Sequence, residues 1–270
     1  MLNKSKLIAL CGYLLCIFPV GYAMSATDKQ VDNIVGGLNS ESPGVAETAL
    51  ADLEKLIDKG EWKQLAQDKQ NQIIQGFIKE LEHGAILARN AESDDAFQHL
   101  RLLGRIAGKL KNPKTIPALI KGLPWEDFED VLVKIGKPAI EPIFGGLESK
   151  IAYVKLSCIS ILEKMRISGK LSVENQQRFK ATLENLAKNG KDQSVRRAAA
   201  YELGDLGDAG TLPLLTTLSE NDTSYYQSKR TGIKSYLVRE AAQEAVKKVK
   251  DRLVEEEKQQ KKLQKSTTAQ

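Results

Sequence analysis

The chain has 270 residues, a formal net charge of +5, 41% hydrophobic residues and only 6% aromatic residues. It contains eight prolines and shows no sustained alternation of apolar and polar residues between turn dipeptides, which argues against a substantial sheet. We therefore expect an all-α globular protein.

The first residues have the three-part pattern of a secretory signal peptide. Lys4 and Lys6 precede an apolar run over residues 7–20, and small residues follow up to Ala26. The run is shorter than the ~20 apolar residues that a membrane-spanning helix needs. We therefore expect a signal peptide over residues 1–23, cleaved after residue 23 or 26, and a periplasmic or secreted protein with no stable membrane span.

The cysteine content and the distribution of charge give little information about a ligand. Cys158 is the one cysteine outside the signal segment, so no intramolecular disulfide is expected, and its place in a helical stripe indicates a buried small residue. Removing Lys4 and Lys6 leaves a net charge of +3. The segment from Lys247 onward carries +4, so the rest of the chain carries −1. The remaining body is therefore close to neutral, and we expect no nucleic-acid partner.

Residues 27–42 are polar and contain glycine, so we expect a leader before a repeat region over residues 43–250. A first helix is predicted over residues 45–57. Apolar residues then recur over residues 62–81, as one helix or two. Further helices are predicted from Thr115, over residues 125–135, after Gly136, and over residues 172–186.

The clearest repeat lies at residues 192–215. Five apolar or small residues share one stripe of its first helix, glycines at 207 and 210 end that helix, and Pro213 begins another: the five are Val195, Ala198, Ala199, Leu203 and Leu206. The same five positions recur at Val154, Ser157, Cys158, Leu162 and Met165, and again at Val238, Ala241, Ala242, Val246 and Val249.

This pattern resembles the HEAT-like repeat family, which includes the HEAT-like repeats of phycobilin lyases. The resemblance implies an all-α, right-handed α-α superhelix of about six helical-hairpin repeats, an armadillo-type solenoid with a concave inner face. Residues 251–270 are expected to continue as a charged capping helix and to end in a disordered tail from Ser266.

No catalytic motif is present in the chain. Its two histidines, His83 and His99, have no metal-ligand spacing in the sequence, and His99 falls on a small-residue position of the repeat, which favours a packed side chain. Asp94 and Asp95 are expected at a helix start. We expect no catalytic residues, no metal and no cofactor.

The candidate partner-binding residues fall in two groups, listed last. The first group lies in a polar segment longer than a repeat turn requires, where the alternative is that one tyrosine packs on the last repeat. The second group lies on predicted inner helices, where the alternative is that an arginine pairs with Asp192. The loop group is Tyr225, Tyr226, Lys229 and Arg230, and the helix group is Lys155, Arg196, Tyr201 and Arg239.

The sequence therefore predicts an exported, non-enzymatic scaffold that binds a protein or peptide on its concave face. The alternative is a ligand- or cofactor-handling module resembling the HEAT-like bilin lyases. A retained visible absorption band would favour that alternative. The partner and the oligomeric state are not readable from the sequence.

Overall fold

The computed structural model describes residues 26–90, 94–123 and 125–268, and within them the chain is helical almost throughout. The α-helices are α1 (Ala26–Leu38), α2 (Pro43–Asp58), α3 (Gln67–Asn90), α4 (Asp94–Leu110), α5 (Ile116–Lys121), α6 (Glu126–Ile135), α7 (Ile140–Gly146), α8 (Ala152–Ile167), α9 (Val173–Asn189), α10 (Gln193–Leu206), α11 (Leu212–Asn221) and α12 (Leu237–Thr268). Short 3₁₀ helices are η1 (Glu61–Gln64), η2 (Pro113–Thr115) and η3 (Lys137–Ala139), and two short strands are β1 (Tyr226–Gln227) and β2 (Lys234–Ser235).

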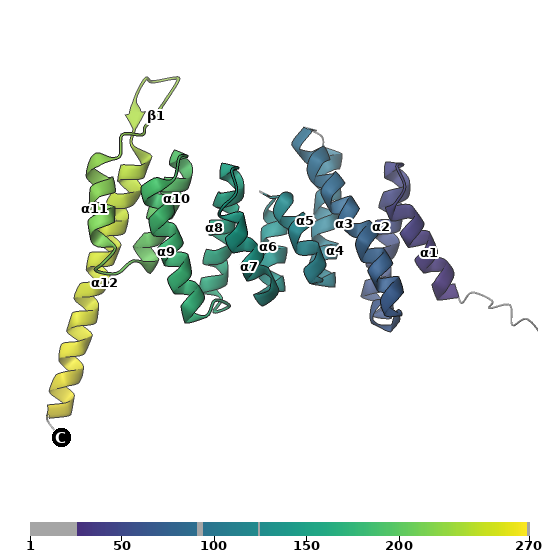
Figure 1. Cartoon of the computed structure of the whole chain (residues 1–270), viewed down its shortest axis with the longest axis horizontal. Helices are drawn as coiled ribbons and strands as arrows, with labels where there is room; N and C mark the ends of the chain where they lie inside the picture. Colours follow the sequence, from purple (N-terminus) through teal and green to yellow (C-terminus); the bar gives the residue numbers. More distant parts are fainter. Residues whose placement is uncertain (1–25, 91–93, 124, 269–270) are drawn as a thin grey trace, which may run out of the picture.

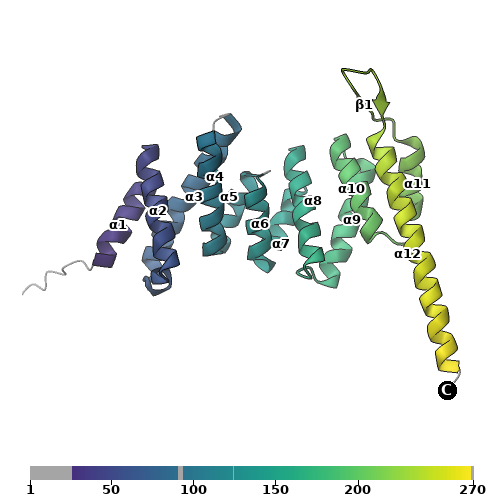
Figure 2. The same ribbon diagram turned by 180° about the vertical axis from the view of Figure 1, so that it is seen from behind.

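The helices stack in two layers along the long axis of the molecule (Figure 1). Helix α2 packs on α4, α4 on α6, α6 on α8, α8 on α10 and α10 on α12, which makes one layer. The odd-numbered helices lie on the other side, as the reverse view in Figure 2 shows. Within the described residues each odd-numbered helix contacts the next even-numbered one, giving six helical hairpins from α1–α2 to α11–α12. The predicted all-α solenoid is confirmed.

The predicted apolar stripe forms the core of the C-terminal repeats. All five stripe positions of α8 are buried, and in α10 and α12 most of them are. The match is poorer in α2, where Ala49, Leu53 and Leu56 are buried but Val45 is 48% exposed. Aligning the first predicted helix on the same repeat places Val45 at the position of Val195, but Val45 lies in the first turn of α2, outside the packed stripe, so that placement in the core is wrong.

Local turn chemistry explains where the helices end. Gly136 has φ of 74°, a left-handed conformation that favours glycine, and it ends α6 just before η3 and α7. The side chain of Ser172 accepts a hydrogen bond from the Asn175 N–H and caps α9. Asp192 accepts hydrogen bonds from the N–H groups of Ser194 and Val195 and caps α10.

Residues 27–42, predicted as a polar leader, mostly form helix α1. Val31, Ile34 and Leu38 recur on one face of α1 and are buried against α2 and α3. This stripe has few residues and lies between polar ones and glycines, so it gains its stability from the neighbouring helices rather than from its own composition. Helix α1 is therefore the first member of the solenoid.

Two other open points are decided by the structure. Residues 62–81 fall in η1, a two-residue link and a single long helix, α3. The tail expected to be disordered from Ser266 is helical up to Thr268 as part of α12. The predicted signal peptide, residues 1–23, lies outside the described residues. Among the described helices, none is both long enough and apolar enough to cross a membrane.

Candidate functional site

The predicted loop group lies on a β-hairpin between α11 and α12, which projects beyond the ends of the stacked helices (Figure 1). Tyr226 pairs with Ser235 and Gln227 with Lys234 in an antiparallel ladder. The Ser228 N–H donates to the Ile233 carbonyl at 3.0 Å, and Gly232, with φ of 70°, shapes the turn. We call residues 225–236 the hairpin.

The surface of the hairpin is aromatic, apolar and basic. Tyr225 is 43% exposed, Tyr226 55% and Ile233 64%. Lys229 and Arg230 are exposed at the tip. The Lys234 ammonium lies 4.1 Å from the centroid of the Tyr225 ring, a cation–π contact that holds both side chains on one side. These tyrosines are not buried in the last repeat, which was the alternative interpretation of them.

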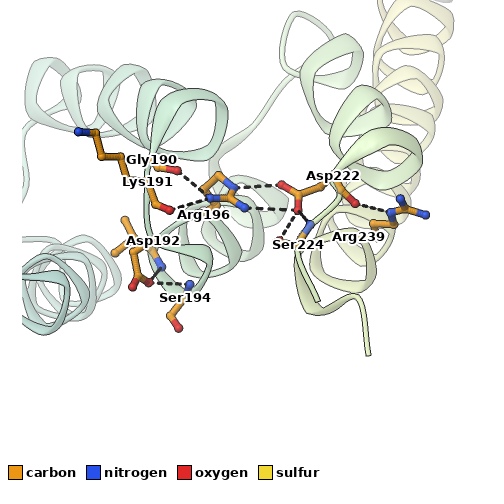
Figure 3. A network of polar contacts seen from close by, with 9 residues as sticks. Gly190, Lys191, Asp192, Ser194, Arg196, Asp222, Ser224 and Arg239 are labelled. Carbon is orange, nitrogen blue, oxygen red and sulfur yellow. Dashed lines mark hydrogen bonds and ion pairs between the residues drawn. The ribbon is translucent and has the colours of Figure 1, made fainter. Parts of the chain in front are cut away.

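Arg196 takes part in a hydrogen-bond network at the junction between repeats (Figure 3). Its Nε donates to Asp222 Oδ2 at 3.0 Å, and its Nη1 donates to the carbonyls of Gly190 at 2.8 Å and Lys191 at 3.3 Å. The two charged side chains are only 14% and 7% exposed. Burial opposes ionisation of Asp222, but hydrogen bonds from Arg196 and Ser224 lower the pKa of its carboxyl.

Arg239 belongs to the same network. Its Nε donates to the Asp222 carbonyl at 2.6 Å, and its guanidinium lies 4.5 Å from the centroid of the Tyr236 ring. The alternative pairing of Arg196 with Asp192 is not observed, because Asp192 caps its own helix and Asp222 is the partner of Arg196. Arg196 and Arg239 thus hold adjacent repeats together; Arg196 uses all three guanidinium nitrogens within the chain, and Arg239 uses its Nε.

The last two predicted residues lie on the even-numbered helices. Tyr201, on α10, is 44% exposed, and the Lys248 ammonium of α12 lies 4.4 Å from its ring centroid. Lys155, on α8, is half-buried and lines a groove of ≈ 520 Å³ between the ends of α7 and α9 and the starts of α8 and α10, together with Lys150 and Lys191. The structure therefore leaves Tyr201 and Lys155 accessible.

The comparison of two junctions shows how the hairpin is attached. The first junction reads Asp192-Gln193-Ser194-Val195-Arg196, and in the second Asp222-Thr223-Ser224 is separated by thirteen residues from Val238-Arg239. In both, the Asp carboxylate accepts a hydrogen bond from the N–H of the Ser two residues later, at 2.8 and 2.9 Å. The hairpin is thus an insertion into a repeat junction that keeps its Asp–Ser contact. Position-by-position comparison of the repeats in the sequence would have revealed it.

An acidic cluster lies between α8 and α10. Donor oxygens of Glu163, Glu202 and Asp205 lie within 4.8 Å of one another. Burial, together with the charges of Glu163 and Asp205, raises the pKa of Glu202 to about 7, although the nearby cations Arg166 and Lys248 partly offset the rise. Arg166 binds Glu163 and Lys248 binds Asp205, so the cluster already has cationic partners from the chain.

Cys158 is buried in α8, as the sequence indicates. Burial raises the pKa of its thiol to about 12, with a smaller contribution from the charge of Glu129. The thiol therefore stays protonated at neutral pH and is not a nucleophile.

Comparisons with known proteins give only weak likenesses. No protein-family model matches the chain, and a search of curated proteins finds no match. An engineered protein of known structure has a TM-score of 0.36 and 17% identity, over 82% of this chain and 96% of its own. A designed armadillo repeat protein has a TM-score of 0.33 and 14% identity, over 81% of this chain and 99% of its own. Six stacked helical hairpins in two layers are themselves the HEAT- and armadillo-like architecture, so the fold is an all-α solenoid of this kind.

Proposed function

We propose that this chain is an exported scaffold that binds a protein or peptide partner, without catalysis, through the hairpin and the neighbouring exposed Tyr201. The observation that carries the proposal is the insertion of the hairpin into a junction that shares its Asp–Ser contact with the preceding junction, which has no hairpin. A segment that stabilises the repeats would be expected to bury its large side chains, whereas this one exposes Tyr225, Tyr226 and Ile233.

The hairpin favours a partner of a particular chemistry. Between Asp222 and Glu240 the chain contains Lys229, Arg230, Lys234 and Arg239 and no acidic residue. Exposed tyrosines provide large contact area at little entropic penalty, and the cations steer an acidic surface toward them. The proposed partner surface is therefore acidic, with apolar pockets that accept the aromatic rings.

Export is supported by the order of charged, apolar and small residues in the first segment of the sequence. N-terminal sequencing of the protein from its native cells should give Met24 or Thr27 as the first residue. An intact Met1 on a cytosolic protein would contradict export and leave the binding proposal to be judged separately.

The binding proposal is tested by placing a photocrosslinking amino acid at Tyr226 and, as a control, at Thr217, an exposed position on the adjacent helix α11. We expect a specific crosslinked partner from Tyr226 alone. With that partner purified, the double change Tyr225→Ala with Tyr226→Ala should weaken binding by about 1 kcal/mol or more, roughly fivefold or more in Kd.

The unfolding midpoint distinguishes tyrosines that contact a partner from tyrosines that stabilise the fold by packing. Because both rings are about half exposed, the double variant should unfold at nearly the same denaturant concentration as the parent. A matched variant, Ile167→Ala, removes an exposed side chain at the end of α8 and should change neither quantity. Lower stability with unchanged affinity of the folded fraction would remove the hairpin from the binding surface.

A further inference from the structure

Both histidines of the chain line one pocket of ≈ 220 Å³ between the first turns of α2 and α4 and the interior of α3. The pocket also contains the carboxylates of Glu41, Glu47, Glu80 and Asp95, and no Lys or Arg among its described lining residues. Two imidazoles with an excess of carboxylates and no competing ammonium or guanidinium group form a set of donors suited to a cation.

The donors are spaced so that they share a face on each helix. Glu80 and His83 are three residues apart on α3, and Asp95 and His99 are four residues apart on α4. Residues at these separations project from the same side of a helix. Because α3 packs directly on α4, the two pairs face each other across one helix–helix contact. Sequence spacing alone did not reveal this, since each helix carries one histidine.

The inner pair of donors is already close. His99 Nε2 lies 3.4 Å from Glu80 Oε2, and their side chains are 12% and 8% exposed. His99 Nε2 is buried and has no hydrogen-bond partner among the described residues. Adjacent ligand atoms of a tetrahedral zinc ion, at bond lengths of about 2.0–2.1 Å, are separated by about 3.3–3.4 Å. The observed separation, which is also that of a simple ion pair, is compatible with two ligands on one ion.

Gly84 makes room for this arrangement. A Cβ atom at Gly84 would lie 2.7 Å from Leu103 Cδ1, 3.2 Å from His99 Cδ2 and 3.6 Å from His99 Nε2. A larger residue would push the imidazole away from Glu80. The outer donors, His83 and Asp95, are exposed, and no three of the four groups have ligand atoms within 4.8 Å of one another in the described structure. His83 and Asp95 must therefore turn toward the inner pair for an ion to bind.

We propose that Glu80, His83, Asp95 and His99 bind a divalent transition-metal ion of the zinc class. The ion clamps α3 to α4, with Glu80 and His99 as the buried pair and His83 and Asp95 completing the shell from the solvent side. Two nitrogen donors favour zinc over calcium or magnesium, which prefer oxygen ligands. The site is separate from the hairpin, and the proposal does not depend on the proposed function.

The test is a calorimetric titration of the untagged, metal-free chain with Zn²⁺. We expect binding of one ion per chain with micromolar or tighter affinity, a rise in the melting temperature, and reversal of both by a chelator. Co²⁺ as a spectroscopic probe should give the intense visible absorption of tetrahedral coordination. Binding should weaken in mildly acidic buffer, because the imidazoles must lose their protons to coordinate.

Variants distinguish this site from adventitious binding. His83→Ala and Glu80→Gln should each weaken zinc binding at least about tenfold. Glu82→Gln and Asp94→Asn are matched controls, because each alters a neighbouring acidic residue outside the pocket lining, and both should bind as the parent does. His83 is exposed, so His83→Ala should leave the helical circular dichroism spectrum of the metal-free chain unchanged.

Three results would overturn the proposal. They are the absence of zinc binding below 1 mM, equal binding by all four variants, and preference for Ca²⁺ or Mg²⁺ over Zn²⁺. An octahedral Co²⁺ spectrum insensitive to His83→Ala would likewise show that surface carboxylates alone hold the ion. Each of these outcomes leaves the partner-binding proposal for the hairpin unaffected.

Discussion

The junction between α9 and α10 and the junction between α11 and α12 begin with the same Asp-x-Ser pattern and end with the same Val-Arg pair. In the first, the chain enters the next helix directly. In the second, the hairpin lies between the two parts. Both keep the Asp–Ser contact, and in both the arginine donates to a backbone carbonyl of its junction. A repeat junction thus tolerates an insertion when the residues that make its contacts lie before and after the inserted segment and not within it.

The strand pairing explains why this insertion is accommodated. The pair Tyr226 and Ser235 brings the two ends of the hairpin side by side, so the chain returns close to its starting point before α12 begins. Val238 is 1% exposed and therefore resumes the core stripe at once. Insertions that return the chain to its starting point disturb the packed elements little, and they are where binding residues often lie.

The largest expected effect is a loss of stability. The comparison asks whether truncating equivalent stripe residues of the last two repeats lowers the free energy of unfolding by the same amount. Leu203 on α10 is fully buried between neighbouring helices, whereas its counterpart Val246 on the last helix is only partly buried. Leu203→Ala should destabilise the fold by about 2–5 kcal/mol through the cavity it leaves, and Val246→Ala by about 1 kcal/mol. Denaturant unfolding measures both, with Lys261→Ala on the exposed end of α12 as a control expected to stay within ~0.5 kcal/mol. Equal losses at Leu203 and Val246 would contradict the view that the last repeat is an end cap.

The second comparison concerns the two arginines. Arg196→Ala leaves the nearly buried Asp222 carboxylate without its ionic partner and should lower the free energy of unfolding by about 2–3 kcal/mol. Arg239→Ala removes one bond to a carbonyl and a ring contact, and about 1 kcal/mol is expected. Because the folded-state pKa of Asp222 is lowered, the contribution of the Arg196 pair is present above the ordinary range of aspartate and is lost as the pH falls through the folded value. A pH-independent effect of Arg196→Ala would mean that the ion pair with Asp222 is not what stabilises this junction.

The smallest effect concerns Glu202, on the face of α10 away from the junction network. Its pKa is raised to about 7 in the folded protein from an ordinary value of 4.5, so protonation stabilises the fold. That contribution is fully present below the ordinary value and is lost as the pH rises through about 7. Glu202→Gln should therefore stabilise the protein by about 1–2 kcal/mol at pH 8, and the gain should shrink as the pH falls toward 4.5. Thermal unfolding of the two proteins across this range measures the gap, and a gap that widens in acid would refute the assignment.

Much of the fold follows from local patterns in the sequence. The stripe Val154, Ser157, Cys158, Leu162 and Met165 repeats at helical spacing, and all five residues are buried. The Ser172 and Asp192 caps and the glycine turn at Gly136 likewise depend on neighbours a few residues away. Such features can be predicted from the sequence because the residues that create them lie within one or two helical turns of one another.

The features that could not be predicted depend on contacts between segments far apart in the sequence. The sequence marks Arg196 as a candidate contact residue, but its ion pair with Asp222 exists only because α11 returns the chain to the start of α10. Helix α1 has too few apolar residues to be recognised alone, and it is buried only because α2 and α3 cover it. In the same way, His83 and His99 share a pocket because two helices pack together. The sequence by itself determined the helices and their apolar faces, since periodicity is local, whereas only the stacking of helices decided which polar side chains meet.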